Sequence, residues 1–339
     1  MLVGVCDFPG PYDFPLAGYG GIERWLWATA LGGRLAGADV HLLGPRWRRE
    51  VGDDWTIRPI RLEDVEPGSL EAKELRAAGY DLLIVGHEYP SHHDWRRTWD
   101  FLDCEVATFQ HAPSFVHRDD AFDGERSRLY CYSPEMVERY AEHQPVLELA
   151  VHLGLDEDDG EPIDGEDLIW VGRLDADKAP HLAAMAAGLL GRRIRFFGPV
   201  FDSAYMETYS DLFAAPHVEL VGEVGGAVKG AAFREGAVCV YTYGRHYVEA
   251  GVATLGESLR AGTPVAALAW RSGTCADAAL CDGAGTTAVV TPQTDDKQAA
   301  HELAAAIERA ATLRATDVRT VGRQLFDPQR HFQRLATRP

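Results

Sequence analysis

The chain alternates short apolar runs with longer amphipathic segments, and it does so in two successive series. Continuous apolar strands separated by helices are typical of a parallel sheet that is covered on both faces. The expected strands of the first series are residues 2–6, 39–43, 81–85, 105–109, 129–132 and 146–151, and those of the second are 168–171, 195–197, 218–221, 237–241, 265–267 and 288–290. We therefore expect an α/β fold built from two doubly wound, Rossmann-like parallel-sheet domains.

An acidic segment rich in Gly and Pro separates the two series. At 339 residues the chain also exceeds what one hydrophobic core usually supports. We expect residues 1–155 to form the first domain, 156–167 an exposed linker, 168–320 the second domain and 321–339 a C-terminal segment. Ligands bind beyond the carboxyl ends of strands in such sheets, so a cleft faced by the strand-to-helix loops of both domains should hold the site.

The composition excludes some partners. Lys and Arg number 33 against 52 Asp and Glu, and the net charge of −19 argues against nucleic acid. The sequence offers no apolar run of about 18 residues, and it begins as a strand rather than as a signal peptide. At most, Trp-Arg-Arg clusters at 47–49 and 95–97 could touch a membrane surface peripherally. Six scattered cysteines without a C-x-x-C pair indicate a reduced, cytoplasmic setting.

Two carboxylates stand eight residues apart, at Glu249 and Glu257. If a helix begins near Thr254, Glu257 lies in its first turn and Glu249 in the preceding loop. Backbone N–H groups and the macrodipole at a helix N-terminus favour anions. The pattern therefore suits a ligand with phosphate at one end and hydroxyl groups at the other, such as a nucleotide-sugar.

A second motif, Gly172-Arg-Leu-Asp-Ala-Asp-Lys178, follows the first strand of the second domain. An arginine fork and a lysine can neutralise a diphosphate leaving group as its charge develops. A solvated loop with two ordinary cations is the alternative. The sequence has no H-E-x-x-H motif, and no Asp-x-Asp pair stands out as a metal site, so nothing in the sequence requires a metal ion.

Glycine loops and one histidine complete the candidates. Gly20 and Gly21 open a helix over 21–35, and Gly225 lies in a second glycine turn, so either backbone could approach a phosphate or could be a simple turn. His111 ends a strand and could face a substrate, although a lone histidine is often a packing residue. The loop His87-Glu88 to His92-His93 could line an acceptor pocket or be an ordinary polar loop.

Gly172-Arg-Leu-x-x-x-Lys178 followed by Glu249-x7-Glu257 resembles the retaining family 4 glycosyltransferases, which have the GT-B fold. Segments 197–199, 222–226 and 249–251 are similar to enzymes of avilamycin-type antibiotic assembly. The sequence has Glu249-Ala-Gly where many members have Glu-x-Phe-Gly, so the identity of the donor sugar does not carry over.

The resemblance implies a role for each matching residue. Arg173 and Lys178 would stabilise the departing diphosphate, and Glu257 would bind the ribose. The remaining donor contacts would be Glu249, Ala250 and Gly251 at the sugar and Gly20, Gly21 and Gly225 at the phosphates or base, with His111 near the transferred sugar. Segment 321–339 would return to the first domain as a helix.

The implied activity is metal-independent, retaining transfer of a sugar from a nucleoside-diphosphate sugar, with UDP or GDP as nucleotide, to a small-molecule or glycan acceptor. No cofactor is implied. A non-catalytic nucleotide-sugar-binding protein of the same fold is the alternative. An NAD-linked oxidoreductase is disfavoured because Gly18-x-Gly-Gly21 is not the dinucleotide fingerprint.

Overall fold

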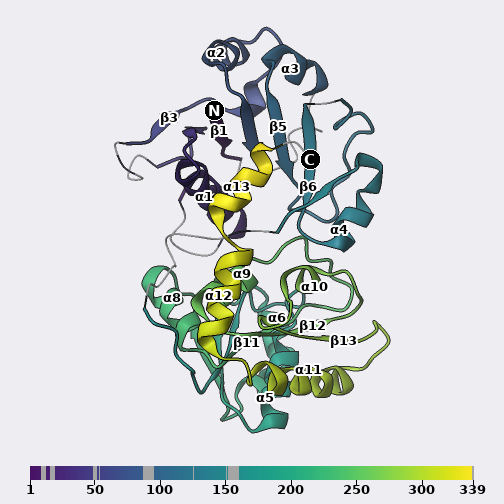
Figure 1. Cartoon of the computed structure of the whole chain (residues 1–339). Coiled ribbons are helices and arrows are strands. Elements are labelled where there is room, and N and C mark those ends of the chain that lie inside the picture. The colour runs from purple at the N-terminus through teal and green to yellow at the C-terminus, as the bar shows by residue number, and fades with distance from the viewer. Residues whose placement is uncertain are drawn as a thin grey trace. The chain divides into compact units, whose positions relative to one another are not determined.

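A computed structural model describes residues 1–8, 13–15, 20–48, 52, 54–86, 95–124, 126–149, 151 and 160–337. The chain divides into two compact units (Figure 1). Unit 1 combines Met1–Leu16 and Gly20–Gly154 with the C-terminal Asp327–Pro339, and unit 2 contains Leu155–Phe326. Each unit contains a parallel sheet and a core of its own, as the two series of apolar runs predict.

Unit 1 is built on a seven-stranded sheet in the order β3-β2-β1-β4-β5-β6-β7, and every described pairing is parallel. Its strands are β1 Leu2–Cys6, β2 Asp39–Leu43, β3 Thr56–Arg58, β4 Leu82–Val85, β5 Glu105–Phe109, β6 Ser127–Cys131 and β7 Val146–Leu147. Its helices are α1 Gly21–Leu35, α2 Leu70–Ala78, α3 Trp95–Leu102, α4 Pro134–Arg139 and α13 Pro328–Ala336, with 3-10 turns η2 Leu62–Asp64 and η4 Ala141–His143. The strand order reverses between β1 and β4, which makes the sheet doubly wound.

Unit 2 repeats this plan with a six-stranded parallel sheet in the order β10-β9-β8-β11-β12-β13. Its strands are β8 Leu168–Val171, β9 Ile194–Phe197, β10 Val218–Gly222, β11 Val238–Tyr241, β12 Val265–Ala269 and β13 Gly285–Val289. Its helices are α5 Pro180–Leu190, α6 Ser203–Thr208, α7 Ser210–Phe213, α8 Gly226–Glu235, α9 Ala253–Ala261, α10 Cys275–Ala279, α11 Asp296–Ala310 and α12 Ala315–Leu325.

The helices of unit 2 form two groups. Helix α5 packs with α11, whereas α8 and α12 pack with α9. Right-handed crossovers that run in opposite directions from the centre of a sheet place their helices on opposite faces. Strands β11 and β12 are buried along their whole length, because they lie in the interior of the sheet and are covered on both sides.

The C-terminal segment differs from the single helix expected within 321–339. Helix α12 ends at Leu325 and belongs to unit 2, where Phe326 packs against Gly256. Helix α13 starts afresh at Pro328, after Asp327, whose side chain accepts the N–H of Arg330. Proline cannot donate inside a helix but suits its first turn, so Pro328 ends one helix and begins the next.

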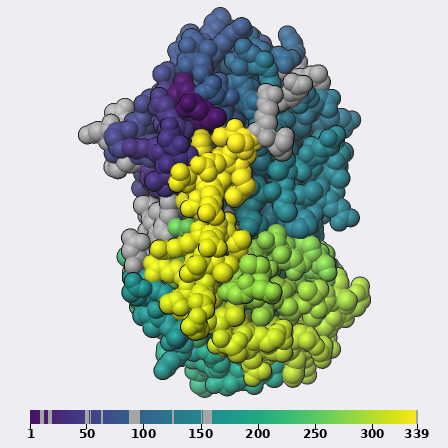
Figure 2. Space-filling view, viewed as in Figure 1, coloured from purple at the N-terminus to yellow at the C-terminus, as the bar shows by residue number. Residues whose placement is uncertain are grey.

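Helix α13 packs on α1 in unit 1, and both helices can be followed in Figure 1. In Figure 2 the yellow C-terminal residues lie on the surface that faces the viewer. The contact is close because Gly32 and Gly33 leave room for the backbone of Pro328 and the ring of Phe332. The boundary between the units therefore follows Phe326, six residues after the expected end of the second domain at residue 320. In the expected linker, residues 160–167 form neither helix nor strand, and 156–159 lie outside the described residues.

Candidate functional site

The strand order of unit 2 reverses between β8 and β11, and the loops that follow these two strands carry most of the candidate residues. Such a reversal is where open α/β sheets bind ligands. Arg173 and Lys178 follow β8, and Glu249, Ala250 and Gly251 follow β11. Because both strands are parallel neighbours, their carboxyl ends bring the two loops together.

Hydrogen bonds join these two loops. The indole N–H of Trp170 donates to the Thr242 hydroxyl at 3.0 Å, and that hydroxyl donates to the carbonyl of Lys178 at 2.8 Å. The N–H of Gly244 donates to the carbonyl of Asp177, also at 2.8 Å. The backbone around Lys178 is therefore held by the loop that contains Glu249.

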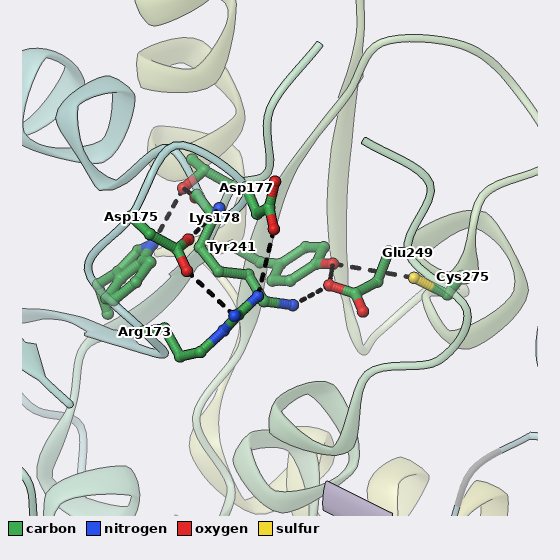
Figure 3. Close-up of polar contacts among 9 residues, drawn as sticks. Arg173, Asp175, Asp177, Lys178, Tyr241, Glu249 and Cys275 are labelled. Carbon is green, nitrogen blue, oxygen red and sulfur yellow. Dashed lines mark hydrogen bonds and ion pairs between the residues drawn. The ribbon is translucent and has the colours of Figure 1, made fainter. Parts of the chain in front are cut away.

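Lys178 and Glu249 form a nearly buried ion pair through Nζ and Oε2 (Figure 3). Their side chains are 16% and 9% exposed. The hydroxyl of Tyr241 donates to the same Oε2 at 3.2 Å, and the Lys178 ammonium lies 5.4 Å from the centre of the Tyr247 ring. In the described part of the chain, no group donates a hydrogen bond to the other oxygen, Glu249 Oε1. One oxygen of this carboxylate is thus available to a ligand.

Arg173 is held by two carboxylates in the same loop, as Figure 3 shows. Its guanidinium lies 3.3 Å from Asp175 and 3.4 Å from Asp177, and it also lies over the ring of Phe201. Burial raises the pKa of Asp175, although the N–H of Lys178 opposes this by donating to its carboxylate at 2.9 Å. These contacts fix the direction of the arginine fork.

Tyr241 is a part of the site to which the sequence analysis gave no role. Burial raises the pKa of its hydroxyl well above the ordinary value, so the group stays protonated and donates to Glu249. The hydroxyl also lies 3.9 Å from the sulfur of Cys275. The one indication of such a role in the sequence is that Tyr241 ends the apolar strand β11.

Glu257 lies in the second turn of α9, because that helix begins at Ala253, and the expectation of a first-turn position was wrong. Its carboxylate pairs with Lys229 of α8 at 2.8 Å, and both side chains are nearly buried. Lys229 was missed as a site residue. The rarity of lysine could have indicated it, because the chain has only four lysines. Two of them, Lys178 and Lys229, are not exposed, and each pairs with one of the two glutamates.

The other donor-side candidates stand at two helix N-termini. Gly225 precedes α8, and Ala250 and Gly251 lead into α9. The residue before each helix, Gly225 for α8 and Val252 for α9, makes no side-chain capping hydrogen bond. A helix N-terminus favours an anion through its backbone N–H groups and its macrodipole.

In unit 1 the structure places three candidates. Gly20 immediately precedes α1 with φ 155°, a conformation that favours glycine, and Gly21 is the first residue of the helix. Apart from its chain neighbours and its own helix backbone, no described atom lies within 4 Å of the position that a Cβ on Gly21 would take. His111 follows β5, and its Nε2 lies 3.2 Å from the hydroxyl of Tyr132.

The expected acceptor-side loop 87–94 lies outside the described residues. Among the residues that are described, no three His, Cys, Asp or Glu side chains gather into a group able to hold a metal ion. None of the described helices combines the length and hydropathy needed to cross a membrane.

No protein-family model and no curated protein sequence matches the chain. Solved structures do. AviGT4, a glycosyltransferase involved in avilamycin A biosynthesis, superposes with a TM-score of 0.72 at 18% identity over 98% of this chain and 95% of its own. HepE (Alr3699) of Anabaena, in complex with UDP and glucose, gives 0.67 at 15% identity over 99% and 98%, and MurG of Acinetobacter baumannii gives 0.52 at 14% over 99% and 98%.

These likenesses cover nearly all of each chain, and with the two doubly wound sheets they define the fold class. The chain has the GT-B fold, as its motifs predict. At such low identity the comparison establishes the fold alone, and function has to be argued from the site.

Proposed function

We propose that the chain is a glycosyltransferase that moves a sugar from a nucleoside-diphosphate sugar to an acceptor hydroxyl with retention of configuration. The observation that carries the proposal is the pair formed by Lys178 and Glu249 at the strand reversal of unit 2. A diphosphate-sugar has an anion and a polyol joined by one bond. An ammonium group and a carboxylate held side by side match that arrangement.

In the proposed mechanism, Arg173 and Lys178 stabilise the diphosphate as its charge develops, which is the largest electrostatic requirement of the transfer. Glu249 accepts hydrogen bonds from the sugar hydroxyls, and Tyr241 keeps it in place. Glu257 accepts hydrogen bonds from the ribose, with Lys229 holding its carboxylate. The remaining donor contacts are assigned to Gly225 and to Ala250–Gly251, which lie at the N-termini of α8 and α9.

Neither glutamate is assigned to activating a nucleophile, so the leaving phosphate itself takes the acceptor proton on the face that it leaves. This assignment predicts retention. Two cations supply the positive charge at the diphosphate, and we therefore propose a metal-independent reaction with a UDP- or GDP-sugar. On the side of unit 1, Gly20 and Gly21 would approach the phosphates and His111 the transferred sugar.

Thermal-shift measurements with UDP, GDP, ADP and NAD test the proposal directly, because a ligand that binds only the native state raises the melting temperature. A shift with UDP or GDP, followed by transfer assays with the matching nucleotide-sugars, is expected. Proton NMR of the product linkage then reads the anomeric configuration. A shift with NAD alone would replace the proposal with an oxidoreductase, and nucleotide-sugar binding without turnover would indicate a non-catalytic binding protein.

A further inference from the structure

Unit 2 contains a cavity that the proposed transfer does not use. Its volume is about 560 Å³, which is in the range of small-molecule sites. The walls come from the N-terminal ends of α5 and α11, from α6 and from the loop after β11. Four of its lining residues are aromatic, namely Tyr205, Tyr209, Tyr247 and Trp270.

A continuous set of polar contacts fixes one wall of this cavity. The carboxylate of Asp296 can only accept, so Nε2 of His181, 3.3 Å away, carries the imidazole proton and donates a hydrogen bond to it. Nδ1 therefore accepts a hydrogen bond from the hydroxyl of Tyr205 at 2.6 Å, and the same hydroxyl accepts the backbone N–H of His181 at 3.2 Å. Asp296 also pairs with Arg245, whose guanidinium lies 4.9 Å from the centre of the Trp270 ring. The polar groups are therefore oriented before any ligand binds.

The charges of the wall disfavour an anionic ligand. Arg245 is balanced by Asp296, and Asp177, the second lining carboxylate, is paired with Arg173. His181 contributes no positive charge near neutral pH, because burial lowers its pKa. A phosphate would find no unbalanced positive charge in this wall. A neutral molecule with both hydroxyl groups and apolar C–H faces fits better, since carboxylates and a guanidinium bond hydroxyls while aromatic rings pack against C–H groups.

The cavity adjoins the proposed donor site through two shared residues. Asp177 lines the cavity and pairs with Arg173, and Tyr247 lines it and lies beneath the ammonium of Lys178. Figure 3 shows Asp177 reaching Arg173 in this loop. A molecule bound in the cavity would therefore lie next to the groups assigned to sugar transfer.

We propose that this cavity binds a glycosyl unit of a neutral carbohydrate. Identification of that carbohydrate as part of the acceptor rests on the proposed function, whereas binding itself does not. Carbohydrate recognition by unit 2 would then extend beyond the donor sugar.

Saturation-transfer NMR on the full chain tests the inference, with the methyl glycosides of glucose, galactose, mannose and rhamnose as neutral probes and glucose 6-phosphate as the anionic one. Transfer to at least one neutral probe is expected, and none to glucose 6-phosphate. Thr208→Trp, at an exposed lining position of α6, should abolish the signal by filling the cavity. Ala204→Trp is the matched control on the same helix, exposed and outside the lining.

Tyr209→Ala should weaken the same binding by about fivefold to tenfold, since it removes one aromatic face. Leu189→Ala, an exposed side chain of α5 outside the cavity, should leave it unchanged. Equal signals in Thr208→Trp and the parent chain, a response to glucose 6-phosphate alone, or no response to any neutral probe would overturn the inference. UDP-induced thermal shifts on the same samples separate the two proposals. UDP binding without carbohydrate binding would contradict only the cavity proposal. Carbohydrate binding without UDP binding would contradict only the proposed transferase function.

Discussion

Each unit contains a buried glutamate paired with a cation, and the two carboxylates are satisfied differently. In unit 1, Glu148 accepts at Oε1 from His331 at 2.9 Å and at Oε2 from Arg334 at 2.7 Å. The indole of Trp25 donates to Nε2 of His331 at 3.1 Å, which places the imidazole proton on Nδ1, toward Glu148. In unit 2, the described residues donate only to Oε2 of Glu249.

This difference distinguishes a structural contact from a binding contact. Side chains of α13 bond both oxygens of Glu148, and these bonds attach α13 to the sheet of unit 1. Burial of Glu249 removes water from its carboxylate, and a ligand hydroxyl that bonds the available oxygen offsets this desolvation cost. Burial alone would raise the pKa of Glu148, but the hydrogen bonds from His331 and Arg334 outweigh this and lower it.

The largest effect should come from Lys178→Ala. Loss of one contact that strengthens in the transition state lowers turnover by about 10²–10³-fold, or roughly 2–4 kcal/mol. Steady-state rates with the nucleotide-sugar found by the thermal screen measure it, and Arg173→Ala should behave similarly. Lys297→Ala, an exposed lysine of α11, is the control. Unchanged turnover in both site variants would leave Glu249 as a structural residue like Glu148.

Glu148→Ala should reduce stability rather than turnover per folded molecule. It leaves the buried N–H of His331 without its acceptor, which costs roughly 2–3 kcal/mol in the free energy of unfolding. Urea denaturation measures the loss, with the exposed Glu142→Ala as the matched control. A loss below about 0.5 kcal/mol would show that the attachment of α13 depends on packing alone.

Stability should also fall as the medium becomes acidic. Burial lowers the pKa of His331, although its bond to Glu148 opposes this, and burial lowers those of His41 and His181 as well. The unfolded chain then takes up these protons first, so the stabilisation is complete above about pH 6.5 and is lost as pH falls, by up to about 1.4 kcal/mol per pH unit for each group. Urea midpoints at pH 7.5 and 5.5 should show a smaller difference in His331→Gln than in the parent chain, and an equal difference would exclude His331 as a contributor.

The smallest effect distinguishes the two glutamates of the proposed site. Glu257→Gln should weaken free UDP by about tenfold, since it weakens the bonds to the ribose, whereas Glu249→Gln should affect only the full nucleotide-sugar. Calorimetry with both ligands on both variants decides between these roles. Equal losses for both ligands would mean that the two carboxylates do not divide ribose and sugar between them.

The elements that could be predicted from the sequence are those with a strong local pattern. Helix α1 begins and ends where its pattern predicts, because Gly20 and the apolar stripe mark both the start and the buried face. The position of Glu249 in a loop before a helix was also predicted, whereas its place beside Lys178 depends on the pairing of β8 with β11. The prediction of a single C-terminal helix was wrong because Pro328 begins a separate helix and does not continue one amphipathic stripe.

Partnerships across long separations could not be predicted in the same way. Glu148 meets His331 across most of unit 1, and Lys229 meets Glu257 from a helix that showed no clear amphipathic pattern. No local pattern encodes these contacts, since they depend on how helices pack after the sheet has formed. The cavity of unit 2 was invisible for the same reason, because its walls come from segments more than one hundred residues apart.

The division of unit 1 between the two ends of the chain bears on the order of folding during synthesis. Domains generally fold as they emerge, the N-terminal one first. Here the sheet and helices of unit 2 are complete once Phe326 has been synthesised, whereas Gly32 and Gly33 of α1 stay uncovered until α13 has been synthesised. Unit 2 can therefore be folded while unit 1 still exposes an apolar face. A chain that ends just before Pro328 would be a natural substrate for chaperones.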